Sequence, residues 1–357
     1  MFQHNPKKME MKLLEEYLHM LEEVPEVPAA VWRELLRCNG EDAAFIAVRA
    51  RAAAQKHYGT GVYVRALVEI SSYCRRACRY CGLRCSNGGA RRYRMTHEEI
   101  MDCCRGAVAK GFSTFVLQGG EDVRQNDEWL ASLVAGIKAE FPDKAVTLSV
   151  GERPASGYAM LRAAGADRYL LRHETADSGH YAELHPSGTT AESRQACLFA
   201  LKELGYQVGS GFMVGSPGQT AEHIVKDLMF LDRLQPQMIG VGPFIPASGT
   251  PFAGEKAGSV ELTLLLISLL RLRFGRALIP ATTALATLHP EGTVRGILAG
   301  ANVVMPNVTP ECYRRQYTIY DNKKSCGAES IDGLACLESG LREIGYHIDF
   351  GRGDYKK

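Results

Sequence analysis

From residue 62 onward, short runs of β-branched or apolar residues alternate with helical stretches, and this alternation limits the possible folds more than any other feature. Strands that alternate with helices favour a parallel sheet, because each helix returns the chain to the same end of the sheet. Eight such units favour a complete (β/α)8 TIM-type barrel over an open doubly wound α/β sheet. The candidate strands are Val62–Ile70, Thr114–Leu117, Ala145–Val150, Arg168–Leu171, Gln207–Val214, Met238–Gly242, Leu278–Ala281 and Asn302–Met305.

Helical segments precede, separate and follow these strands. We expect N-terminal helices that pack on the barrel over residues 1–57, the barrel itself over 58–310, and a C-terminal closing segment of the same domain over 311–357. The candidate helices are Lys8–Glu23, Ala29–Arg37, Glu41–Gln55, His97–Lys110, Glu128–Glu140, Tyr158–Ala164, Ala191–Leu204, Ala221–Leu234, Val260–Arg273 and Gly333–Glu343.

The composition argues against several classes of partner. The 42 basic and 40 acidic residues leave a net charge of +2, so no overall field favours nucleic acid or an anionic membrane. The N-terminus lacks an export signal, and the most apolar run, Leu262–Leu270, is shorter than the roughly 20 residues that span a bilayer. We expect a cytoplasmic protein, in which the eleven cysteines serve metal or cluster ligation better than a disulfide framework.

Unusual residues gather where the candidate strands end. Active sites of (β/α)8 barrels lie at the C-terminal ends of the strands, so the pattern predicts an active site there. A cysteine-rich loop follows the first strand, and polar or glycine-rich strings follow the others. These strings are Gln118–Asp122, Gly151–Arg153, Arg172–Thr175, Met213–Gly215, Gly242–Phe244, Thr282–Thr283 and Met305–Asn307.

The cysteine loop carries Cys74, Cys78 and Cys81 in the spacing C-x3-C-x2-C, with an aromatic residue directly before the third cysteine. Three thiolates on a [4Fe-4S] cluster leave one iron open. The open iron can bind the amino and carboxylate groups of S-adenosylmethionine (SAM). The spacing therefore predicts both a cluster and SAM.

Two other uses of these cysteines must be weighed. A zinc site typically uses C-x2-C pairs and a fourth Cys or His ligand. Cys85 also extends the pattern to four cysteines, and a cluster bound by all four would be closed. A closed cluster only transfers electrons or stabilises structure, so that alternative is a non-catalytic iron–sulfur electron carrier.

The loop resembles the signature of the radical SAM superfamily. Further strings sharpen the resemblance to the HydE family of [FeFe]-hydrogenase maturases, which runs from about Leu13 to the C-terminus. The strings are Cys78–Arg84, Arg92–Thr96, Val116–Asp122, Asp167–Thr175, Met213–Thr220, Ile239–Pro246 and Pro280–Thr283.

The resemblance implies an enzyme that reductively cleaves SAM to a 5′-deoxyadenosyl radical. It implies a role in assembling the di-iron subcluster of [FeFe]-hydrogenase from a cysteine-bearing iron carbonyl/cyanide precursor. The implied partners are the maturases HydG and HydF and a one-electron donor such as flavodoxin or ferredoxin. A methylornithine synthase-like mutase and a biotin synthase-like sulfur inserter remain rivals, although the latter needs further cluster ligands inside the barrel.

The same resemblance implies residue roles. Cys74, Cys78 and Cys81 would bind the cluster. The residues implied in binding SAM are Tyr80, Gly119, Gly120, Glu121, Glu174, Arg194 and Met213, and those implied at the substrate are Arg65, Gln118, Arg168, Arg172, Thr282, Thr283 and Tyr313.

Two of these implied residues have a structural alternative. An arginine buried in a barrel is costly unless it is paired. An anionic substrate would pair Arg65 and Arg168, but so would a carboxylate of the protein such as Glu152.

One feature departs from the family pattern. Some members carry a second cluster near the C-terminus, with its last two cysteines spaced C-x2-C. Here the region has Cys312, Cys326 and Cys336, which lack such a pair. We therefore expect no second cluster.

Overall fold

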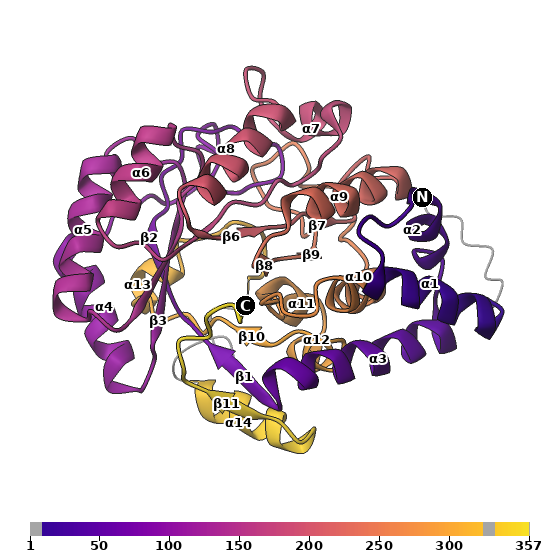
Figure 1. The fold of residues 1–357 in the computed structure, drawn as a ribbon. Coiled ribbons are helices and arrows are strands. Elements are labelled where there is room, and N and C mark those ends of the chain that lie inside the picture. The colour runs from indigo at the N-terminus through magenta and orange to yellow at the C-terminus, as the bar shows by residue number, and fades with distance from the viewer. Residues whose placement is uncertain (1–8, 324–332, 357) are drawn as a thin grey trace.

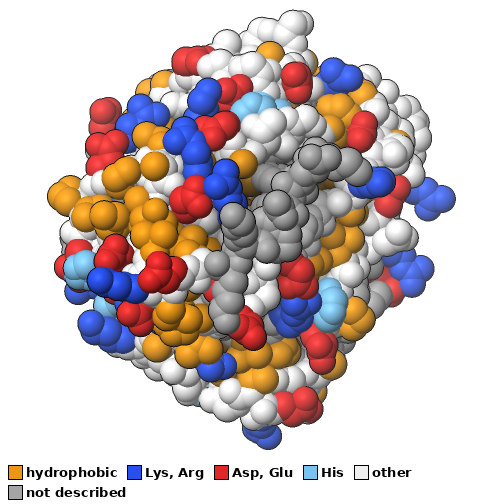
Figure 2. All heavy atoms as spheres, turned by 90° about the vertical axis from the view of Figure 1, so that its right-hand side faces the viewer, with side chains coloured by type: hydrophobic (Ala, Val, Ile, Leu, Met, Phe, Trp, Pro, Cys, Tyr) orange, Lys and Arg blue, Asp and Glu red, His pale blue; other side chains and the backbone are white. Residues whose placement is uncertain are grey.

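The computed structural model describes residues 9–323 and 333–356. Its N-terminal helices are α1 (Met11–Glu23), α2 (Ala29–Leu35) and α3 (Gly40–Tyr58). Apolar residues three and four apart give α1 one buried face, and α3 packs along α10 (Val260–Arg273). These helices form one side of the molecule (Figure 1). That side carries acidic and basic side chains interspersed with apolar ones (Figure 2), in keeping with the small net charge.

The strands lie inside a surrounding layer of helices (Figure 1) and pair in parallel, which confirms the predicted α/β class. One sheet has the order β2-β3-β4-β5-β6-β8, a second has β10-β1-β11, and β7 pairs with β9. The bounds are β1 Gly61–Val64, β2 Ala66–Ser71, β3 Thr114–Gly119, β4 Ala145–Ser149, β5 Arg168–Leu170, β6 Gln207–Ser210, β7 Met213–Val214, β8 Met238–Ile239, β9 Gly242–Pro243, β10 Val303–Val304 and β11 His347–Asp349.

The predicted helices between strands are present. They are α4 (His97–Ala109), α5 (Asp127–Glu140), α6 (Ala155–Ala163), α8 (Ala191–Glu203), α9 (Ala221–Leu234), α10 and, near the end, α14 (Leu334–Glu343). Four short helices were not predicted, because they are too short to show an apolar period. These are α7 (Ser178–Leu184), α11 (Thr283–Leu288), α12 (Gly292–Leu298) and α13 (Glu311–Arg314).

Several strand predictions need correction. Three predicted strands are each interrupted, and one break is at Gly211, where φ is +152° and a Cβ would lie 1.9 Å from the carbonyl oxygen of Gly240. The predicted strand Leu278–Ala281 forms only isolated bridges, at Leu278 and Pro280. Proline has no N–H to donate to a ladder, which explains why the pairing there stays short.

Isolated parallel bridges lie between the edges of the sheets. They join Met238 to Leu278, Pro280 to Val303, and Leu67 to Asn307. Backbone hydrogen bonds follow the same line, including Leu278 N to Gln237 O at 2.9 Å and Leu67 N to Pro306 O at 2.9 Å.

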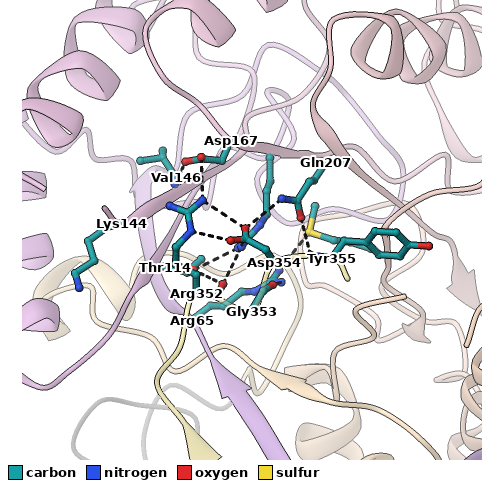
Figure 3. Close-up of polar contacts among 12 residues, drawn as sticks. Arg65, Thr114, Lys144, Val146, Asp167, Gln207, Arg352, Gly353, Asp354 and Tyr355 are labelled. Carbon is teal, nitrogen blue, oxygen red and sulfur yellow. Dashed lines mark hydrogen bonds and ion pairs between the residues drawn. The ribbon is translucent and has the colours of Figure 1, made fainter. Parts of the chain in front are cut away.

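The C-terminal segment continues from β11, which pairs with β1, and reaches among the starts of the strands (Figure 3). Arg168, fully buried as the first residue of β5, donates to Arg352 O at 2.7 Å and to Asp354 Oδ1 at 2.6 Å. Arg65 donates to Gly353 O at 3.3 Å and to the sulfur of Met238 at 3.2 Å. Groups of the protein itself therefore hold both arginines.

Asp354 is the carboxylate of this contact. Burial alone would raise its pKa, but hydrogen bonds from Arg352 and Arg168 hold the pKa of Asp354 well below its usual range. A carboxyl group whose pKa is lower in the folded state stabilises the fold at pH values above its unfolded-state pKa, which is near 4. This contribution is lost as the pH falls through the folded-state pKa.

We expect Asp354→Ala to lower the free energy of unfolding at pH 7 by about 2 kcal/mol, because it leaves Arg168 buried without its carboxylate. This expected loss of unfolding free energy is smaller than for a fully buried ion pair, because the Asp354 side chain is 41% exposed. Urea titration measures the change, and the deficit should shrink below about pH 4. Asp143→Ala, at a side chain 72% exposed, is the matched control. Equal midpoints for both variants would contradict the assignment.

Candidate active site

The cysteine loop leaves β2 and lies at the C-terminal ends of the strands. Cys74, Cys78 and Cys81 are free and partly buried, whereas Cys85 is exposed. Burial, followed by the neighbouring Cys74, raises the pKa of Cys78 to about 12, and burial, followed by Cys78, raises that of Cys81. Burial and the neighbouring cysteines thus disfavour ionisation of Cys78 and Cys81, and a cationic metal centre would relieve this.

The loop also offers hydrogen bonds to sulfur. The N–H groups of Arg76 and Glu121 both donate to Cys74 Sγ at 3.4 Å. Within residues 9–323 and 333–356, no three His, Cys, Asp or Glu side chains are arranged to hold a single ion. An iron–sulfur cluster places each cysteine on a different iron, so the three sulfurs need not converge on one point. The three cysteines therefore fit a cluster.

A charged network connects this loop to the neighbouring strand ends. Glu121 Oε2 accepts from Arg75 Nε at 3.0 Å and from Arg76 Nε at 2.6 Å. Glu152 accepts from Arg76 Nη2 at 3.1 Å and pairs with Arg194 Nε on α8. Three guanidinium groups meet two carboxylates, so the network keeps a surplus positive charge. An incoming carboxylate would balance it.

Glycines let the strands approach this network. A Cβ on Gly120 would lie 2.3 Å from Tyr73 O and 2.5 Å from Cys74 Cβ, so only glycine fits beside the cysteine loop. Gly151 has φ +79°, and a Cβ there would lie 2.2 Å from Glu121 Cγ.

Tyr80, which the resemblance places in one region with Met213, packs against the apolar cluster that contains Met213. The other members of this cluster are Leu184, Phe244 and Phe252. The cluster is a suitable wall for a flat aromatic base.

His185 holds the hydroxyl of Tyr80. Burial, followed by the charge of Arg194, lowers the pKa of His185 to about 3, so the ring is neutral. Its Nδ1 donates to Tyr181 O at 3.1 Å, which leaves Nε2 to accept from Tyr80 OH at 3.1 Å. His185 was not foreseen as part of the site.

Glu174 follows β5 in a left-handed conformation, with φ +64°. Arg172 Nη2 donates to its carboxylate at 2.9 Å. Arg194 Nη1 in turn donates to Arg172 O at 3.0 Å. These contacts connect three of the predicted site residues.

Other predicted site residues are more dispersed. Gln118 Nε2 donates to the hydroxyl of Tyr317 at 3.4 Å. Thr282 precedes α11, and its buried Oγ1 has no hydrogen-bond partner among the residues described. Thr283 is the first residue of α11. Tyr313 donates its hydroxyl to Glu99 on α4 at 2.6 Å, so that hydroxyl is already engaged.

Arg65 and Arg168 are placed differently from the expectation that they face a substrate. The C-terminal segment occupies them at the starts of the strands, whereas the cysteine loop lies at the strand ends. Glu152, suggested as their partner, pairs with Arg76 and Arg194 instead. No local pattern in the sequence indicated these pairings, because the partners lie far apart along the chain.

A buried ion pair between Glu69 of β2 and Lys323 was also not foreseen. Lys323 additionally lies over the ring of Tyr317, at 4.9 Å from its centroid. The sequence did contain one indication of this pair, because Glu69 interrupts the apolar run Leu67–Ile70.

We expect Gly151→Ala to lower the iron content obtained after cluster reconstitution, because the new methyl group displaces Glu121 from Arg75 and Arg76. Gly188→Ala is the matched control, since Gly188 also has positive φ (+84°) but open space around its Cβ position. Both variants pay a backbone cost of roughly 1 kcal/mol. Iron and sulfide analysis should show less of both in Gly151→Ala than in Gly188→Ala. Equal iron content would contradict the role of Glu121 in holding the cysteine loop.

No helix in the described part of the chain is long and apolar enough to cross a bilayer.

Comparison with known proteins places the chain in a family. Residues 68–231 match the Radical SAM superfamily. The [FeFe] hydrogenase maturase subunit HydE of Thermotoga maritima is 48% identical over 291 residues, which cover 82% of this chain and 83% of the relative. A 3-methylornithine synthase of Methanosarcina acetivorans is 31% identical over 257 residues, covering 71% and 72%.

A solved structure supports the fold. The crystal structure of the maturase HydG superposes with a TM-score of 0.83 at 20% identity, covering 98% of this chain and 79% of the other. This likeness concerns the fold alone, whereas the sequence identity to HydE extends over most of both chains. The chain is therefore an enzyme of the radical SAM superfamily and belongs, within it, to the HydE family of hydrogenase maturases.

Proposed function

We propose that this enzyme cleaves SAM reductively and acts in assembly of the di-iron subcluster of [FeFe]-hydrogenase, on a cysteine-bearing iron carbonyl/cyanide precursor. The 48% identity to HydE over most of both chains carries the proposal. The cluster of free thiols beside a cationic network supports the SAM chemistry.

Cys74, Cys78 and Cys81 would hold a [4Fe-4S] cluster and leave one iron for SAM. When bound, the cluster supplies the electron that breaks the sulfonium C5′–S bond. The protein's part is to place SAM and keep water away from it.

We assign the SAM contacts to residues of four strand ends and α8. Arg194 would bind the carboxylate of SAM, and that carboxylate would balance the surplus positive charge of the network. Backbone carbonyls at Gly119 and Gly120, next to Glu121, would accept from the ammonium group. Glu174 would contact the ribose, and Tyr80 with Met213 would enclose the adenine.

We assign the substrate contacts to Gln118, Arg172, Thr282 and Thr283. The buried Oγ1 of Thr282, which has no hydrogen-bond partner in the part of the chain that the structure describes, supports this, since a buried hydroxyl normally has a partner. Arg65 and Arg168 we reassign to holding the C-terminal segment, and we leave Tyr313 out because its hydroxyl is bound to Glu99.

We further propose that the strands close into one complete eight-stranded barrel, in a single unit with the N-terminal helices and the C-terminal segment. The bridges at Leu278, Pro280 and Asn307 support closure between β8 and β2. One apolar core also includes residues of α1, the strands and α14.

The proposed partners are HydG and HydF and a one-electron donor such as flavodoxin or ferredoxin, in the cytoplasm. We propose that no second cluster is bound. Cys312 and Cys336 are exposed, and Cys326 lies outside the described residues.

The function is tested by maturing an [FeFe]-hydrogenase in vitro with HydG and HydF, with or without this enzyme. Wild type should restore activity and form 5′-deoxyadenosine, and Arg194→Ala should lower SAM affinity at least tenfold, which is about 1.4 kcal/mol. A hydrogenase that is equally active when matured with and without this enzyme would contradict the maturase proposal. Accumulation of 3-methylornithine in expressing cells would favour the mutase, which the 31% identity to that synthase makes the second candidate.

Cys85→Ala tests the electron-carrier alternative. We expect normal iron content and normal SAM cleavage, because three cysteines suffice for an open cluster. Cys78→Ala, the matched control within the same loop, should lose both. Electron paramagnetic resonance (EPR) of the reduced cluster should also shift when SAM is added. Loss of the cluster in Cys85→Ala, together with a wild-type EPR spectrum that does not change when SAM is added, would instead support a closed cluster and an electron carrier.

A further inference from the structure

A buried polar trio lies behind the strand end that carries Glu174. It consists of Ser210, the last residue of β6, His173, and Asp227 in the middle of α9, and none of the three is exposed. His173 Nδ1 lies 3.0 Å from Ser210 Oγ, and His173 Nε2 lies 3.5 Å from Asp227 Oδ1. Polar groups this deeply buried cost free energy unless they are hydrogen-bonded or paired with an opposite charge.

The hydrogen bonds fix where the protons lie. Ser210 Oγ donates to Leu171 O at 3.2 Å, so its lone pairs are left for His173 and Nδ1 carries a proton. Nε2 then faces the Asp227 carboxyl, and two lone pairs would repel unless a further proton lies between them. Burial, the largest influence, raises the pKa of Asp227, in keeping with a shared proton.

Aromatic rings immobilise the histidine. The ring of His173 lies 4.8 Å from that of Phe230 and 5.7 Å from that of Phe212, centroid to centroid. The trio is therefore closed off from solvent and substrate, and it has no access to the reaction itself.

Asp227 also binds the backbone that follows Glu174. Its Oδ1 accepts from Ala176 N at 2.5 Å. Glu174 N donates to Gly211 O at 3.1 Å, and Thr175 N to His173 O at 2.8 Å. The turn around Glu174 is thus held on one side by the β6–β7 connection and on the other by α9.

Glu174 needs this support, because a left-handed backbone at φ +64° is unfavourable for a non-glycine residue and persists only where its surroundings hold it. We propose that Asp227, with His173 and Ser210, is a positioning residue that holds the Glu174 carboxylate in place for SAM. The inference rests on the proposed function, in which Glu174 contacts SAM.

The test measures SAM affinity of the reconstituted holoenzyme by EPR titration of the reduced cluster. Asp227→Ala removes the acceptor for Ala176 N and should weaken SAM binding about tenfold at unchanged iron content. Asp227→Asn keeps an oxygen for Ala176 N and should bind SAM within about threefold of wild type. Asp232→Ala is the matched control: Asp232 is buried on the same helix but pairs with Arg273. It should lower the melting temperature and leave SAM affinity unchanged.

A double-mutant cycle with Glu174→Ala separates positioning from a general loss of structure. If Asp227 acts through Glu174, Asp227→Ala should not weaken SAM binding further in the Glu174→Ala background. Unchanged affinity in Asp227→Ala, or full additivity with Glu174→Ala, would overturn the inference while leaving the SAM role of Glu174 intact. Normal affinity in Glu174→Ala alone would instead remove that role, and the inference with it. Should Asp227→Ala fail to fold, Ser210→Ala deletes one hydroxyl of the trio and enters the same cycle, with about threefold weakening expected.

Discussion

The ion pairs between Arg76, Glu121, Glu152 and Arg194 are the constraint on which the rest of the site depends. Arg76 belongs to the cysteine loop, the two carboxylates follow β3 and β4, and Arg194 lies on α8. The Glu121 side chain is 7% exposed and that of Glu152 is 10% exposed, so neither carboxylate could be left unpaired cheaply. An irregular loop is thereby tied to regular strands, and the cysteines gain defined positions without secondary structure of their own.

The parallel fold and the position of the site were predictable because they depend on local patterns. Strand runs and helix periods are read within about fifteen residues, and a parallel arrangement then brings all strand ends to one edge. The loop with Cys74 and the strand-end strings with Gly120 and Glu174 were found in this way, whereas Arg194 and the roles at SAM came from the resemblance to the HydE family and stay predictions. The same resemblance placed Tyr80 near Met213, and Tyr80 packs against the apolar cluster that contains Met213.

What the sequence could not show are pairings between distant residues. Arg168 reads equally well as a substrate ligand or as a structural cation until Asp354 is seen beside it. The break at Gly211 depends on the carbonyl of Gly240, in the connection between β8 and β9. Each of these is a tertiary fact that no local window contains.

The contact between Arg168 and Asp354 also affects how the chain folds. The two residues are 186 positions apart, and loop closure over such a distance is slow and costly in entropy. Until the segment around Asp354 docks, the start of β5 carries an uncompensated guanidinium in a forming core. We therefore expect the starts of the strands, where this segment docks, to exclude water late in folding.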